Sequence, residues 1–434
     1  MDIAFLTFFL GLVTGPRSVA VSAGPSVAVV ELRLDGARVA RLTAPPWTAT
    51  VDFGRELVPH DLEAAAFDAE GKPAGAARQR VNLPRALAVA SIALEDAPGG
   101  KRIARITWVC AFATRPSSVR LAWDNEKLTP PDPFRFELPS AAPSSLHILR
   151  AELAFGRNVT AVAQTFVGGQ GRNFTSAELT SVPVVVSGKK TPGPEALAGW
   201  FLRGGKPADV VAVEEGPADV VFVPDPEAEP ALDRLLAERE KDDWGVSVYG
   251  AAGLARLAYE LPKDVNSLFA LPAAIRFDAT GYQVFSAVGP FDHSDGGLLY
   301  AFRLARTDQP PRDAANLKDV AAMAGTVAVQ NGRRRAAVWI LSEGRDLSDP
   351  AWDVARRYLR TLHVPLFVWR VAKDGSSAKV APGELDVSSD GKLNKAISQL
   401  SKALASQRVV WLDGLFLPQA ISLSPSAKGL EIAR

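Results

Sequence analysis

The tetrapeptide Asp292-His293-Ser294-Asp295 has the residue types best suited to chemistry. A histidine between carboxylates can hold a metal ion or act in an acid–base pair. The same residues directly precede a segment with helical spacing, where Asp295 or Ser294 would form an ordinary N-cap. Because a short motif is weak evidence by itself, we favour the cap.

Other nucleophiles and metal ligands are sparse. The single cysteine, Cys110, excludes an internal disulfide, a thiolate zinc cluster and an iron–sulfur site, and its apolar surroundings favour a buried structural thiol. No Gly-x-Ser-x-Gly elbow, Walker loop or dinucleotide fingerprint occurs. The histidines are scattered, which argues against a histidine-rich metal centre: His60, His147, His293 and His363. We therefore identify no catalytic residues and expect that the protein is not an enzyme.

The charges of the chain nearly cancel. Its 434 residues carry 49 Lys and Arg against 48 Asp and Glu, a net charge of +1. Such a balance lacks the basic surface that phosphate backbones require, so we expect no nucleic-acid partner. The basic run Arg333-Arg334-Arg335 is interpreted as a solvated turn before a strand. A hydrophobic content of 47% fits a folded protein of about two to four domains.

The amino terminus carries an apolar run over residues 3–13. Its length suits the h-region of a signal peptide and is too short for a membrane span, and Val21-Ser22-Ala23 could serve as a cleavage site. Alternatively, residues 15–21 form the first strand of the next domain. The first interpretation places the protein in the periplasm or outside the cell, and the second in the cytoplasm. No other segment approaches the length of a membrane span.

Two stretches have the short alternating strands and frequent turns of β-sandwiches, residues 1–85 and 86–187. In the first, a strand over residues 27–34 meets Asp35-Gly36, whose residue types favour a tight hairpin. Trp123-Asp124-Asn125-Glu126 takes the corresponding place in the second stretch. We therefore predict a second copy of a related sandwich.

The composition and rhythm then change. Residues 188–199 have the composition of a linker. From residue 200 to 434, apolar strands such as 335–341 and 365–371 alternate with amphipathic helices such as 350–362. Strands of this kind predict a parallel sheet covered on both faces, and hence an α/β doubly wound, Rossmann-like domain with a C-terminal extension.

Two sets of motifs resemble known families. The first stretch is similar to bacterial immunoglobulin-like (Ig-like) domains, through Leu34-Asp35-Gly36, Pro45-Pro46-Trp47, Val51-Asp52-Phe53-Gly54 and Ala66-Phe67-Asp68. Residues 333–371 resemble the later half of a von Willebrand factor type A domain, with the strand ending Leu341-Ser342-Glu343-Gly344 and then His363-Val364-Pro365-Leu366. Ig-like motifs followed by type A motifs, in that order along the chain, resemble the VWFA-related proteins of Acidobacteria.

That resemblance implies a site for Mg²⁺ or Mn²⁺ at the carboxyl ends of the strands, built from Asp-x-Ser-x-Ser, a threonine and an aspartate. The first element falls on Asp225-Pro226-Glu227-Ala228-Glu229, where both serines are replaced by glutamate, and the threonine position is Gly297. Glu343 replaces the aspartate. The metal candidates are therefore Asp225, Glu227, Glu229 and Glu343. Since the hydroxyls are gone, we expect a degenerate site without a cofactor, although the carboxylates could accept Ca²⁺.

These observations favour a non-enzymatic, adhesion-type protein that binds another protein and has a degenerate metal site. One alternative is a hydrolase or other enzyme that uses acids at the strand ends, namely Asp225, Glu343 and the loop 292–295. Another is a structural subunit of an envelope assembly.

Overall fold

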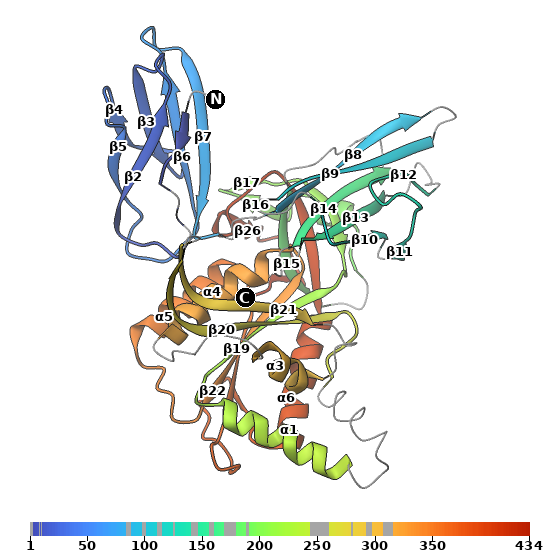
Figure 1. Ribbon diagram of the computed structural model, residues 1–434. Coiled ribbons are helices and arrows are strands. Elements are labelled where there is room, and N and C mark those ends of the chain that lie inside the picture. The colour runs from blue at the N-terminus through green and yellow to red at the C-terminus, as the bar shows by residue number, and fades with distance from the viewer. Residues whose placement is uncertain are drawn as a thin grey trace.

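The computed structural model describes residues 3–7, 9, 11–83, 88–97, 101–110, 115–124, 126–139, 146–155, 160–168, 179–187, 191–243, 260–278, 281–291, 297–306 and 316–434. Strands account for 45% and helices for 20% of the structure. Figure 1 shows an N-terminal β-sandwich whose lower end meets the helices α4 (Leu317–Val329) and α5 (Pro350–Thr361), a second sandwich beside a group of antiparallel strands, and a helix-covered sheet below them. No helix in the described ranges is long and apolar enough to cross a membrane.

The first sandwich consists of two antiparallel sheets that share one core. One sheet has the order β1-β2-β5, with β1 Ile3–Phe5, β2 Pro16–Ala23 and β5 Thr48–Asp52. The other has the order β4-β3-β6-β7, with β3 Val29–Leu34, β4 Ala37–Leu42, β6 His60–Phe67 and β7 Pro73–Val81. Alternate side chains point inward, among them the fully buried Val30, Leu32 and Leu62. The predicted hairpin is confirmed, since Asp35 and Gly36 both have positive φ, 52° and 84°, between β3 and β4.

The second sandwich repeats this topology strand for strand. Its sheets have the orders β12-β9-β8 and β11-β10-β13-β14. The strands are β8 Ala88–Ala97, β9 Lys101–Cys110, β10 Ser118–Trp123, β11 Glu126–Leu128, β12 Arg135–Glu137, β13 Leu146–Ala154 and β14 Thr160–Gly168. Strands β8 to β14 thus correspond in chain order to β1 to β7, and each strand pairs with the counterparts of the same neighbours. The prediction of a second copy is therefore confirmed.

The two copies also share a polar contact at the same hairpin. Asp35 Oδ2 lies 2.7 Å from Nδ1 of His60, and Asp124 Oδ2 lies 2.6 Å from Nδ1 of His147. In each copy the other carboxylate oxygen accepts the backbone N–H of the residue after the histidine. Both aspartates have positive φ, 52° and 51°, a conformation that aspartate tolerates. The contact ties the turn to the start of a neighbouring strand.

Two further antiparallel sheets lie between the sandwiches and the helices. One has the order β18-β25-β15-β27, with β15 Leu179–Val186, β18 Val210–Glu214, β25 Gln407–Asp413 and β27 Leu430–Ile432. The other has the order β17-β16-β26, with β16 Phe201–Arg203, β17 Lys206–Pro207 and β26 Ile421–Leu423. They pack around Val184, Phe201 and Leu412, together with the 3-10 helix η1 Pro194–Leu197. A second 3-10 helix, η4, spans Pro418–Ala420.

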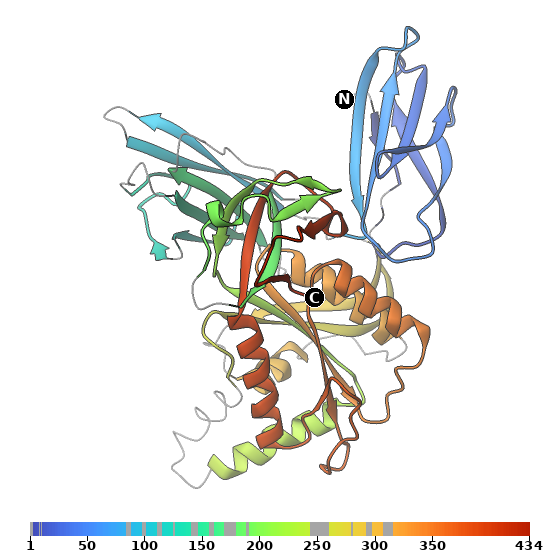
Figure 2. The same ribbon diagram turned by 180° about the vertical axis from the view of Figure 1, so that it is seen from behind.

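The largest sheet has the order β21-β20-β19-β22-β23-β24 and is called the mixed sheet below. Its strands are β19 Ala218–Pro224, β20 Val265–Asp278, β21 Gly281–Phe291, β22 Arg334–Ser342, β23 Leu366–Val371 and β24 Glu384–Asp386. Helices α1 Glu229–Asp243, α3 Leu298–Arg306 and α6 Asp390–Ala405 pack on one face, and α4 Leu317–Val329 and α5 Pro350–Thr361 on the other. Figure 2 shows α6 and the pair α4 and α5 on opposite sides. β19 and β22 are buried along their whole length.

The fold class expected from the sequence, with a doubly wound α/β domain over residues 200–434, is wrong. The chain is predominantly β, and only five strands of the mixed sheet run parallel, because β21 is antiparallel to β20. The apolar stretch at residues 409–412 lies in β25, which pairs antiparallel with β15 and β18. The physical reason is that a strand buried on both faces is apolar whichever way its neighbours run.

Candidate functional site

Asp225 directly follows β19, at the carboxyl end of the mixed sheet, where ligands of such sheets commonly bind. The side chain is fully buried. Arg345 donates from Nε to Oδ2 at 3.0 Å and from Nη2 to Oδ1 at 2.8 Å. The backbone N–H groups of Ser342 and Glu227 donate to the same carboxylate at 3.2 and 3.0 Å. A guanidinium of the chain itself thus pairs with both carboxylate oxygens of Asp225, and this ion pair raises the pKa of Arg345.

Among the other predicted metal ligands, Glu227 shares a partner with Asp225, because Arg345 Nη2 donates to both carboxylates. Glu227 is half exposed and pairs with Arg345 at 2.9 Å and with Lys373 at 3.3 Å. Glu229 instead pairs with Arg306 on α3 at 3.3 Å. Glu343 is exposed to solvent. Over the described ranges no group of three or more His, Cys, Asp or Glu side chains could hold a metal ion. The residues present therefore do not fit a divalent cation.

A second arginine holds the loop that carries Arg345. Arg370 on β23 forms a two-point ion pair with Glu384, with both distances 3.0 Å. Its Nη1 also donates to the backbone oxygens of Ser342 and Arg345, at 3.1 and 2.8 Å. Since Arg370 and Glu384 are nearly buried, this contact fixes the backbone from which Arg345 reaches Asp225.

The remaining candidates from the sequence lie elsewhere. The tetrapeptide 292–295 falls outside the described residues, while Gly297 is buried just before α3. Cys110 is partly exposed at the end of β9 in the second sandwich. Cys110 therefore adds no group to the carboxyl end of the mixed sheet.

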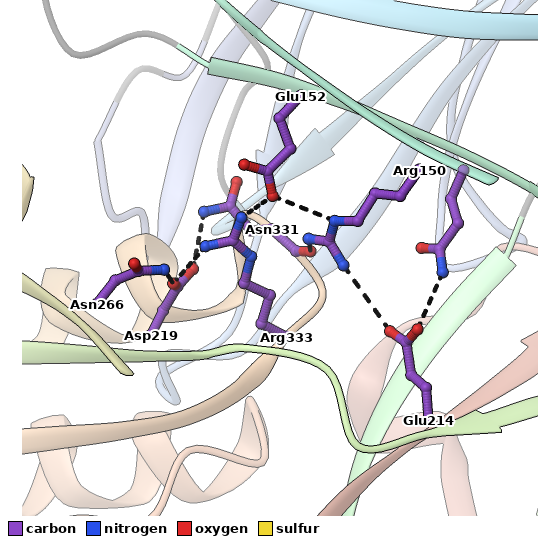
Figure 3. Close-up of polar contacts among 8 residues, drawn as sticks. Arg150, Glu152, Glu214, Asp219, Asn266, Asn331 and Arg333 are labelled. Atoms are coloured by element: carbon purple, nitrogen blue, oxygen red, sulfur yellow. Dashed lines mark hydrogen bonds and ion pairs between the residues drawn. The ribbon is translucent and has the colours of Figure 1, made fainter. Parts of the chain in front are cut away.

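The amino end of the mixed sheet carries a buried polar network that the sequence did not reveal. We call it the junction cluster, because it joins the second sandwich to β18 and to the mixed sheet (Figure 3). Its members are Arg150 and Glu152 on β13, Gln164 on β14, Glu214 on β18, Asp219 on β19, Asn266 on β20, Arg333 and Asn331.

The contacts of the junction cluster alternate in charge. Arg333 donates to Asp219 Oδ1 at 2.8 Å and to Glu152. Arg150 Nε donates to Glu152 at 3.2 Å, and its Nη1 lies 3.8 Å from Glu214. The amides of Asn266 and Asn331 donate to the two oxygens of Asp219, both at 2.8 Å, and Gln164 donates to Glu214 at 3.3 Å. The second sandwich is thus fixed to the mixed sheet by charge-assisted contacts.

Burial dominates the electrostatics of this cluster. Asp219 is 1% exposed, and desolvation raises its pKa although the two asparagine amides oppose the shift. Desolvation likewise lowers the pKa of Arg150. Burial, followed by repulsion from Arg150 and Arg120, lowers the pKa of Arg333 to about 9. Charges held so deep are retained only while each has its partners.

The interpretation of residues 333–335 as a solvated turn is wrong. Arg333, Arg334 and Arg335 are only 6%, 5% and 2% exposed. Arg334 pairs with Asp264, and Arg335 donates from Nε to the backbone oxygen of His363 at 3.2 Å. The sequence signal for this burial was the position of the run. Arg333-Arg334-Arg335 leads directly into a fully buried strand, so its residues lie close to the core.

A pocket of about 890 Å³ opens next to the junction cluster, and we call it the junction pocket. One wall is the second sandwich, through β10, β11 and the segment after β11. The other wall is formed by Gly216, Pro217 and Asp264, just before β19 and β20. The apolar residues of the lining are Val119, Leu121, Ala122, Leu128, Pro130, Pro133 and Pro217, of which Val119, Leu121 and Leu128 also pack in the core of the second sandwich. Its size lies in the range of pockets that bind organic ligands or peptide side chains.

No family model and no curated protein matches this chain, so the resemblance to VWFA-related proteins stays a prediction. Solved structures similar to it include fibronectin(III)-like modules of Clostridium thermocellum CbhA, at 12% identity over 18% of this chain and 92% of that chain, with a TM-score of 0.17. The central fibronectin-III array of RIM-binding protein is 12% identical over 48% and 80%, with a TM-score of 0.22. A β-glucuronidase of glycoside hydrolase family 2 is 11% identical over 40% of this chain and 21% of its own length, with a TM-score of 0.19. Likenesses at these TM-scores assign no function.

Proposed function

We propose that this chain is a non-enzymatic binding protein that holds a segment of another protein in its junction pocket without a metal ion. The observation that carries the proposal is the pocket itself, which is large, has mostly apolar walls, and lies between two bodies of the molecule that the junction cluster fixes together. A preformed pocket between rigid parts loses little conformational entropy when a ligand enters it.

The acids of the pocket support binding rather than chemistry. Glu152 is paired with Arg333 and Arg150, and Asp264 is paired with Arg334. A carboxylate held in ion pairs with arginine is a poor general base. At the carboxyl end of the sheet, Asp225 is tied in the same way by Arg345, which supports a metal-independent protein. In the described residues no observation favours the alternative of a hydrolase.

Selection from a peptide library tests the proposal. Phage-displayed random peptides of twelve residues would be selected on the full chain and counter-selected on Ala122→Trp, which adds an indole inside the pocket. Val39→Trp, which adds the same side chain at an exposed position of the first sandwich, is the matched control. We expect enriched peptides that bind the wild type and Val39→Trp alike and bind Ala122→Trp at least about tenfold more weakly. If no peptide is enriched, or if all bind Ala122→Trp equally well, the proposed function is wrong.

A further inference from the structure

The junction pocket has an excess of positive charge. Its lining contains three cations, Arg120, Lys127 and Arg150, against the acids Glu152 and Asp264. Both acids are already neutralised by arginines at the amino end of the mixed sheet. Arg120 and Lys127 are exposed, and across the described ranges neither has an ion-pair partner. Arg150 is itself paired with Glu152 and Glu214, so an anion entering the pocket would meet two unpaired cations, Arg120 and Lys127.

The strand register places these three cations around one small residue. Ala122 on β10 lies opposite Lys127 on β11 and opposite Arg150 on β13. Arg120 lies two residues earlier on β10 and therefore on the same face. Directly opposed residues have Cβ atoms about 5 Å apart, and diagonal neighbours about 7 Å. The methyl group of Ala122 thus leaves a space beside Arg120, Lys127 and the paired Arg150, with Glu152 diagonal to it on β13.

Arg120 also acts on the junction cluster. It lies directly opposite Glu152 in the strand register and, after burial and Arg150, lowers the pKa of Arg333. Glu152 is held by Arg333 and Arg150, so in the described part of the chain Arg120 has no ion pair with it.

The rest of the lining is suited to apolar side chains. Pro130 continues the wall beyond Lys127, and Pro217 lies across from it, just before β19. The proline rings offer a rigid apolar surface without hydrogen-bond donors. A volume of about 890 Å³ exceeds what one small inorganic anion would fill.

We propose that the junction pocket recognises an acidic side chain within an extended, apolar segment of a partner protein. The carboxylate lies above Ala122 and pairs with Arg120 and Lys127, and the apolar neighbours of the acidic residue pack against Pro130 and Pro217. This inference rests on the proposed function, because it names the chemistry of the segment that the pocket holds.

The test reads the composition of peptides whose binding depends on the pocket. Peptides from the twelve-residue library that bind the wild type and are lost on Ala122→Trp would be sequenced. We expect one or two Asp or Glu flanked by Leu, Ile, Val or Phe, with Lys and Arg depleted. The same selection on the double variant Arg120→Glu/Lys127→Glu should enrich basic residues instead. Arg41→Glu reverses an exposed cation on β4, the counterpart of β11 in the first sandwich, and should leave the acidic preference unchanged.

The affinity of a single synthetic peptide provides a second test. A synthetic peptide from the wild-type pool should bind at least about tenfold more weakly when its Asp is replaced by Asn, and more weakly as NaCl is raised. Peptides that depend on the pocket but are neutral or basic, or that bind the double variant unchanged, would overturn this inference and leave the proposed function intact. If no pocket-dependent peptide is found, the proposed function fails as well, and the two failures are thereby distinguished.

Discussion

The two ends of the mixed sheet differ in how the charged residues beside its hydrophobic core are paired and buried. At the carboxyl end, Asp225 is closed by Arg345, which remains 22% exposed and belongs to a loop of the same sheet. At the amino end, Asp219 and Arg333 belong to a network that reaches the second sandwich, and their side chains are 1% and 6% exposed. The first arrangement is local and reached by water, whereas the second is buried and joins separate parts of the molecule.

The comparison shows where this chain has room for a ligand. In parallel sheets the carboxyl end is the usual site, but here an internal ion pair occupies it. The amino end, which usually serves stability, borders the junction pocket instead. We therefore infer the position of the ligand site from the charges that the chain leaves unpaired.

The largest effect should come from Arg333→Met. Methionine fills a similar volume but leaves Asp219 and Glu152 buried without their main cation. Breaking a buried ion pair costs about 3–5 kcal/mol of unfolding free energy, which urea denaturation would measure. Arg356→Met, which breaks an exposed pair with Asp353 on α5, is the control and should cost less than about 1 kcal/mol. Equal losses in the two variants would mean that the network is no stronger than a surface pair.

A pH-dependent effect should follow from His363, which precedes β23 at the same amino end. Burial, with repulsion from Arg335 and Arg434, lowers the pKa of His363 from 6.5 to about 3. Below pH 6.5 the unfolded chain therefore binds a proton that the folded chain rejects. The stability that this histidine contributes is complete above pH 6.5 and falls as the pH drops toward 3, by about 3 kcal/mol at pH 4.

His363→Asn isolates this contribution. Asparagine tolerates the positive φ of 56° at this position and does not titrate. We expect the wild type to lose about 3 kcal/mol more than the variant between pH 7 and pH 4, by urea denaturation at each pH. Parallel pH profiles would contradict the assignment of a suppressed protonation to His363.

Local structure was accessible from the sequence because it depends on neighbouring residues. The Asp35-Gly36 hairpin and its counterpart at Trp123-Asp124 require only residue types that accept positive φ. The alternation along the strands then predicted the β-sandwich fold of the first two stretches. Strand direction was not accessible, since the apolar residues 409–412 suit an antiparallel sheet as well as a parallel one.

The candidate site was harder to predict because its partners are distant in the sequence. Glu152 and Arg333 meet across 181 residues, and the basic run at residues 333–335 does not indicate which acids it meets. Similarly, nothing near Asp225 indicates that Arg345, 120 residues later, takes the position of a cation. A motif predicts which residues can ligate a metal, but the tertiary fold decides which cation reaches them.

The smallest of the effects predicted here belongs to the carboxyl end, through Arg345→Met. Asp225 would lose its two-point partner but keep the two backbone N–H donors, and water already reaches the position of Arg345. We therefore expect a loss of about 2 kcal/mol of unfolding free energy, less than for Arg333→Met. Arg345→Lys should fall between wild type and Arg345→Met, because lysine restores the charge without the planar fork.

Lys373→Met is the matched control at this end, since it removes the exposed contact with Glu227 and leaves Asp225 untouched. Such a surface pair contributes less than about 0.5 kcal/mol, and less still at high salt. If Lys373→Met destabilised the protein as much as Arg345→Met, the carboxyl end would be held by its surface charges rather than by the Asp225–Arg345 pair. The contrast between the two ends would then reduce to depth of burial alone, with no special role for the Asp225–Arg345 pair.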